Sequence, residues 1–151
     1  MSKLRVYQGH LMEGKEIGMG LESERRCKEF RQLVGSEYEY LTPESWQASV
    51  EKQDIEKIDY MKWQSASIII VDLYDQGLLS EKGNPLLGIG SCVELGWTIN
   101  HNKTQRNKKI CVIITRTPVN VHPFFKSSGI HKNCTSLEEA ALYVKEKKWK
   151  K

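Results

Sequence analysis

The sequence lacks any apolar run that approaches the roughly 20 residues needed for a membrane-spanning helix. Its opening, MSKLRVYQGH, also lacks the apolar stretch of a secretory signal peptide. With 39% apolar and 28% charged residues, the 151-residue chain has the composition of an ordinary globular protein. We therefore expect a single domain that resides in the cytoplasm and has no membrane partner.

Cysteine is scarce and scattered. There is no C-x-x-C pair, and the histidines do not cluster, so the short ligand pairs of a zinc site are missing. We expect no metal, and we expect reduced, mostly buried thiols at all the cysteines, which are Cys27, Cys92, Cys111 and Cys134.

The segment after the first expected strand, QGHLMEGKEIG, lacks the phosphate-binding signatures of two common cofactors. It contains neither the G-x-G-x-x-G of a dinucleotide site nor the Ser/Thr-rich cradle of a flavin phosphate. We expect no cofactor.

Excess charge is confined to the C-terminal end of the chain. Residues 145–151, KEKKWKK, hold five lysines and one glutamate, which equals the whole net charge of +4. A basic run of this kind is typical of a solvated helix end. We interpret it as a tail beyond a domain of residues 1–144, and nucleic-acid binding is not expected because the rest of the chain is neutral.

Short apolar segments alternate with helical periodicity along the chain, which predicts βαβ units and a parallel sheet. The runs SIIIV and KICVIIT have the continuous β-branched character of strands that are covered on both faces. The pattern predicts an α/β, doubly wound, five-stranded sheet of flavodoxin-like type. We expect strands at 4–7, 37–41, 67–71 and 109–115, a short one near 131–134, and helices at about 22–34, at about 49–65, from 91 and from 136.

Polar and glycine residues gather where these strands end, the edge at which open α/β sheets bind ligands. Tyr7 and Gly9 close the first strand, and Asp72 and Asp75 follow the third, where carboxylates can bind sugar hydroxyls or cap a turn. Asp59 lies on the helix that leads into the third strand.

The segment GIGSCVELG carries a second acid, Glu94, which we expect in the first turn of its helix. Gly88, Gly90 and Gly96 would let a ligand and a neighbouring backbone approach closely. Ser91 could bind a phosphate or a sugar hydroxyl, although a plain N-cap role is the simpler interpretation.

Together these segments resemble the nucleoside 2-deoxyribosyltransferase family and its nucleotide N-glycosidase relatives. VYQGH matches the opening strand with Tyr7 and Gly9, IEKIDYMKWQSASIII places Asp59 eight residues before a strand, and GIGSCVELGW matches the E-L-G segment with Glu94. The resemblance implies that Glu94 is a nucleophile that attacks the anomeric carbon, that Asp59 is the acid/base or binds the sugar, and that Tyr7 orients Glu94. It also implies a small nucleoside or nucleotide substrate and a homo-oligomer.

Gly88 departs from the family pattern, which has an aspartate or a serine at that position, so neither the nucleoside nor the nucleotide assignment transfers. Two alternatives stay open: a nucleosidase acting on NAD or an ADP-ribose-type nucleotide, and a nucleotide-binding protein without turnover.

Overall fold

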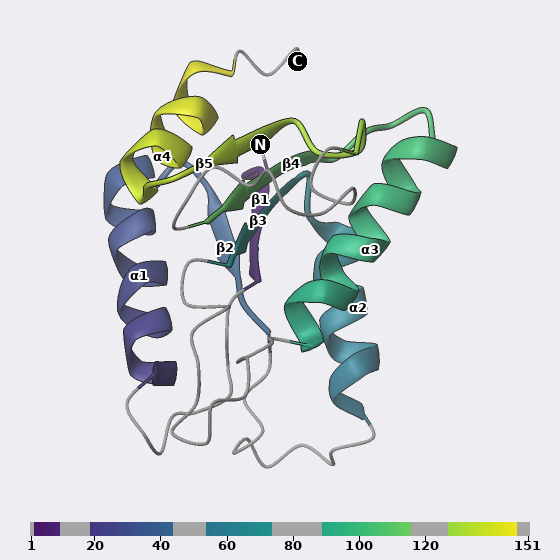
Figure 1. Cartoon of the computed structure of the whole chain (residues 1–151), viewed down its shortest axis with the longest axis horizontal. Helices are drawn as coiled ribbons and strands as arrows, with labels where there is room; N and C mark the ends of the chain where they lie inside the picture. The colour runs from purple at the N-terminus through teal and green to yellow at the C-terminus, as the bar shows by residue number, and fades with distance from the viewer. Residues whose placement is uncertain (1, 10–18, 44–53, 74–88, 116–126, 148–151) are drawn as a thin grey trace.

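The computed structural model describes residues 2–9, 19–43, 54–73, 89–115 and 127–147 (Figure 1). These residues form one parallel sheet and the helices that cover it. The elements are β1 (Arg5–Gly9), α1 (Met19–Val34), β2 (Glu39–Leu41), α2 (Ile55–Ser65), β3 (Ile68–Asp72), α3 (Ile89–Thr104), β4 (Ile110–Ile114), β5 (Lys132–Cys134) and α4 (Leu137–Glu146).

The strand order is β2-β1-β3-β4-β5, and every neighbouring pair is parallel. This is the order of a flavodoxin-like doubly wound sheet, so the predicted fold class is confirmed. The short strand expected near 131–134 is present as β5. No helix among the described residues is long and apolar enough to cross a membrane.

Helices cover both faces of the sheet, with α1 and α4 on one side and α2 and α3 on the other (Figure 1). Alternate residues of β3 show the division: Ile68 and Ile70 pack in the cluster with α1 and α4, whereas Ile69 and Val71 pack with α2 and α3. All five residues of β3 are buried, which explains its unbroken apolar character in the sequence.

Local signals in the sequence set two helix ends as expected. Gly35 adopts φ 111°, and its N–H donates to the carbonyl of Arg31, which closes α1. At the start of α4, the Ser136 hydroxyl accepts from the N–H of Glu139, and the Glu139 carboxylate accepts from the N–H of Thr135.

The start of α3 differs from the expectation. The helix begins at Ile89, so Ser91 lies inside its first turn and Glu94 lies in its second turn. The predicted N-cap role of Ser91 and the predicted first-turn position of Glu94 are therefore wrong. The segment directly before this helix, residues 85–88, contains no Ser, Thr, Asp or Asn that would mark the start of the helix in the sequence.

Candidate active site

The candidate site lies at the carboxyl edge of the sheet, where β1 and β3 end side by side. Gly9 pairs with Val71 in the register of these two strands, and Asp72 follows immediately. The chain leaves β1 toward the β2 side and β3 toward the β4 side, so this edge is the topological switch point at which doubly wound sheets bind ligands.

Glu94 reaches this edge from α3 and is held there by Tyr7. The Tyr7 hydroxyl donates to Oε1 of Glu94 at 2.7 Å. Both side chains are buried, with 0% of Tyr7 and 3% of Glu94 exposed. The predicted contact between Tyr7, near the end of β1, and Glu94 of the E-L-G segment is therefore present as a hydrogen bond.

The second carboxylate oxygen of Glu94 lies against Gly9. A Cβ atom added to Gly9 would lie 2.2 Å from Oε2 of Glu94, a distance that side chains do not tolerate. Glycine at this position leaves room for the carboxylate, which would have to move if any other side chain began here. Within the described part of the chain, Oε2 is buried and has no hydrogen-bond partner.

Burial and two neighbouring groups change the acidity of Glu94. Its pKa is raised to about 8: burial raises the pKa most, the hydrogen bond from Tyr7 lowers it, and the negative charge of Asp59 adds a smaller increase. Burial, followed by the charge of Glu94, also raises the pKa of Tyr7, so the phenol stays protonated and remains a donor. A positive charge that develops beside Oε2 would lower the pKa of Glu94 and favour its ionised form.

Asp59 approaches the same centre from α2. Its side chain is half-buried, and its charge acts on both Tyr7 and Glu94. Three elements thus bring together the three residues predicted as catalytic: β1 provides the tyrosine, α2 the aspartate and α3 the glutamate.

Two solved structures have the same fold. A conserved protein from Enterococcus faecalis V583 superposes with a TM-score of 0.62 and 10% sequence identity, over 96% of this chain and 99% of that one. The Clostridium botulinum CMP N-glycosidase BcmB superposes with a TM-score of 0.55 and 12% identity, over 93% and 96%. The chain shares its fold with both proteins. No family model and no curated protein matches the sequence.

Ser91 is a second polar group that faces inward on α3. It is 1% exposed, and its Oγ has no hydrogen-bond partner among the described residues. It precedes Glu94 by three residues, so both side chains lie on one face of the helix. A buried hydroxyl without a partner is costly, and a ligand that enters beside Glu94 could satisfy it.

Asp72 is engaged on the opposite face of the sheet. Arg26 of α1 donates to it twice, from Nε at 2.8 Å and from Nη2 at 3.2 Å, and both side chains are nearly buried. The sequence interpretation missed Arg26, although Phe30 one turn later is buried, which places Arg26 on the inward face of its helix. The ion pair with Arg26 already occupies the carboxylate of Asp72. The role of Asp72 in substrate binding stays a prediction.

The other predicted site residues give a mixed outcome. Asp75 and Gly88 lie outside the described residues, and Gly90 is the second residue of α3. In the described part of the chain, a Cβ at Gly96 would meet nothing within 4 Å, so no described backbone approaches that glycine closely, and the approach of a ligand there stays a prediction. Among the described residues, no group of His, Cys, Asp or Glu is placed to hold a metal ion.

The thiols match the expectation with one difference. Cys27, Cys111 and Cys134 are buried, and all the cysteines are free, whereas Cys92 is exposed on the outer face of α3.

Proposed function

We propose that the protein cleaves or exchanges the N-glycosidic bond of a (deoxy)nucleoside or nucleotide through a covalent glycosyl-enzyme on Glu94. The observation that carries the proposal is the carboxylate itself. One oxygen is fixed by Tyr7, and the other is buried, lacks a partner among the described residues and lies against a glycine at the carboxyl edge of the sheet. Such an oxygen is oriented for attack and not engaged in structure.

The chemistry follows the retaining pattern of a nucleophilic carboxylate and a second acid. In the first step Oε2 of Glu94 bonds to the anomeric carbon, the C–N bond breaks with its electron pair on the base, and Asp59 supplies a proton to the base. In the second step water, or a second base, gives its proton to Asp59 and attacks the anomeric carbon. The bond to Glu94 then breaks and restores the carboxylate.

The similarity to the CMP N-glycosidase supports hydrolysis of a nucleotide, and the residues shared with the nucleoside 2-deoxyribosyltransferase family support the same bond. A deoxysugar would react more easily, because no 2′-hydroxyl withdraws electrons from the developing cation. A homo-oligomer stays a prediction, which light scattering on the purified protein would test.

The test is to incubate the protein with CMP, dCMP, cytidine and deoxycytidine, with and without a free acceptor base, and to measure base release by chromatography. We expect Glu94→Gln to lose at least about a thousandfold in rate. Glu138→Gln is the matched control, because Glu138 is exposed on α4, away from the site. Equal rates for the wild type and Glu94→Gln would refute the nucleophile assignment. Release of nicotinamide from NAD, in place of base release from these substrates, would favour the nucleosidase alternative.

A further inference from the structure

Two buried side chains join α2 to α3 directly behind the candidate site. The indole Nε1 of Trp63 donates to Oγ1 of Thr98 at 2.9 Å. The same hydroxyl donates to the backbone carbonyl of Glu94 at 2.8 Å. Trp63 is 3% exposed and Thr98 is 0% exposed, so water does not compete for these bonds.

The position of this link along the two helices relates it to both acids. Trp63 follows Asp59 by four residues on α2, and Thr98 follows Glu94 by four residues on α3. Residues four apart lie on one face of a helix, about 6 Å along its axis. The hydrogen bond therefore connects the two helices one turn below the pair of carboxylates, on the faces that carry them.

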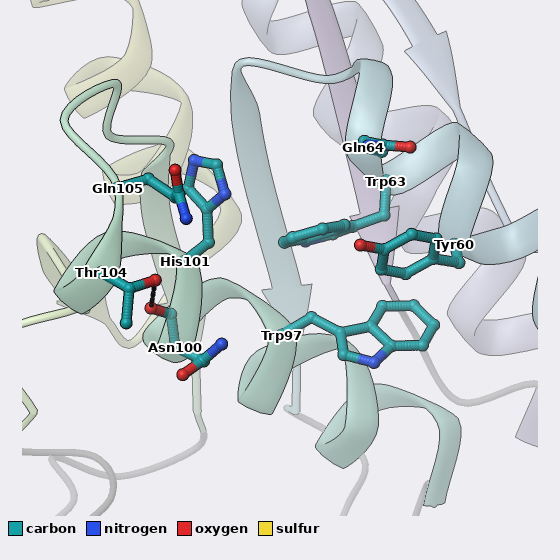
Figure 2. A pocket seen from close by; sticks show the side chains of 8 residues that line it. All are labelled: Tyr60, Trp63, Gln64, Trp97, Asn100, His101, Thr104 and Gln105. Atoms are coloured by element: carbon teal, nitrogen blue, oxygen red, sulfur yellow. Dashed lines mark hydrogen bonds between the residues drawn. The ribbon is translucent and has the colours of Figure 1, made fainter.

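The other described contacts along this seam are ring contacts and the apolar packing of Trp63 with Leu95 and Ile99. The ring centroids of Tyr60 and Trp97 are 5.0 Å apart, and those of Trp63 and Trp97 are 5.7 Å apart. Both helices contribute side chains to a groove of about 400 Å³ on the outer side of the seam. Figure 2 shows the side chains that line it. Ring contacts tolerate sliding better than a hydrogen bond does, since their attraction depends weakly on orientation.

Lys109 also contacts Trp63, from the side of the sheet. The ammonium group of Lys109, the residue before β4, lies 4.9 Å from the centre of the Trp63 ring. The same group donates to the carbonyls of Ala66 at 2.6 Å and Gln64 at 2.9 Å, which fixes the end of α2. The indole is thus kept in one orientation by the sheet on one side and by Thr98 on the other.

We propose that Trp63 and Thr98 are positioning residues whose hydrogen bond sets the separation between Asp59 and Glu94. This inference rests on the proposed function, in which Glu94 attacks and Asp59 transfers the proton. When the bond is lost, the packing contacts and the Lys109 anchor at the end of α2 remain, and the Asp59 end of α2 can shift along α3 by about 1 Å. The two carboxylates then move relative to each other, although neither one has been altered.

The helix provides a matched control. Thr104 donates to the carbonyl of Asn100 at 2.8 Å, the same four-residue bond within α3 that Thr98 makes, but it is exposed. Thr104→Val therefore removes the intrahelical bond without disturbing the link between the helices. Thr98→Val and Trp63→Phe remove that link from either side, and Thr98→Ser retains the hydroxyl.

The first measurement is the split between kcat and KM for base release. We expect Thr98→Val and Trp63→Phe to lower kcat roughly ten- to a hundredfold with little change in KM, because a displacement near 1 Å acts on the chemical step. The double variant should lose no more than the poorer single variant, since both remove one interaction. Thr98→Ser and Thr104→Val should stay near the wild type. If Thr98→Val or Trp63→Phe matches Thr104→Val, the proposal is wrong.

The second measurement does not depend on turnover. The groups that act on Glu94 from the elements packed against α3 are Tyr7 of β1 and Asp59 of α2, and the charge of Asp59 raises its pKa. A carboxyl-carbon NMR titration, assigned by comparison with Glu94→Gln, should give a lower pKa for Glu94 in Thr98→Val and Trp63→Phe, and an unchanged pKa in Thr104→Val. An unchanged pKa in all variants would refute the positioning role. A lowered pKa in a protein that releases no base would instead refute only the proposed function.

Discussion

Replacing Gly9 with alanine tests the geometry of the site with a single methyl group. The new Cβ would lie 2.2 Å from Oε2 of Glu94, whereas ordinary contacts begin near 3.4 Å. The carboxylate must therefore move by about 1 Å, and the change is localised because the nearest atom outside Glu94, the carbonyl oxygen of Ile70, is 3.8 Å away.

The size of the effect follows from that displacement. A shift near 1 Å in a reacting group costs on the order of a hundredfold in rate. It also strains or breaks the 2.7 Å hydrogen bond from Tyr7, which contributes about 1.5–3 kcal/mol where Glu94 is ionised, above about pH 8. We expect Gly9→Ala to lower kcat for base release roughly a hundredfold and to lower the melting temperature by several degrees.

The control for this variant lies on the helix that carries Glu94. A Cβ at Gly96 meets nothing within 4 Å, so Gly96→Ala should keep full activity. It should also gain up to about 1 kcal/mol in stability, because alanine favours a helix interior over glycine. The reasoning is refuted if Gly9→Ala keeps kcat within twofold of the wild type while remaining folded by circular dichroism.

Three further outcomes follow from contacts in and beside the site. Tyr7→Phe removes a hydrogen bond that lowers the pKa of Glu94, so the acidic limb of the pH profile of kcat/KM should move to higher pH; an unmoved limb would contradict the assignment. Burial raises the pKa of Glu94 from 4.5 to about 8, so the folded state holds its proton more tightly than the unfolded state does. Stability should therefore fall as pH rises from 4.5 toward 8, and denaturant titrations of Glu94→Gln should lack that decline. Asp72→Ala removes the nearly buried ion pair with Arg26 and should cost about 3–5 kcal/mol in urea unfolding, whereas Arg5→Ala, at a half-exposed ion pair, should cost less than about 1 kcal/mol.

The sequence predicts the sheet well because its strands carry strong local signals. The β-branched runs of β3 and β4 are buried along nearly their whole length, and Gly35 and Ser136 act where their residue types indicate. The start of α3 is misplaced by two residues, since a glycine-rich approach gives no capping signal.

In the candidate site, too, residues with a local sequence signal could be predicted and their long-range partners could not. Tyr7, Asp59 and Glu94 can be named from short motifs, because each motif consists of residues that are close together in the sequence. Their partners cannot be named in this way. Arg26 and Asp72 are 46 residues apart, and Trp63 and Thr98 are 35 apart, so those contacts exist only once the layers have packed. Periodicity places Arg26 on an inward face, but it does not say which carboxylate will meet it.

The hydrogen bond from Tyr7 to Glu94 joins residues 87 positions apart, across most of the folded chain. A folding intermediate that has assembled β3, β4 and α3 without docking β1 would leave Glu94 hydrated, with an ordinary acidity and no phenol to orient it. Contacts of this sequence separation carry a high entropic cost of loop closure. The carboxylate of Glu94 should therefore reach its native burial and orientation late, together with the global folding transition. Recovery of activity during refolding should then coincide with the final cooperative phase and not with the earlier appearance of helix.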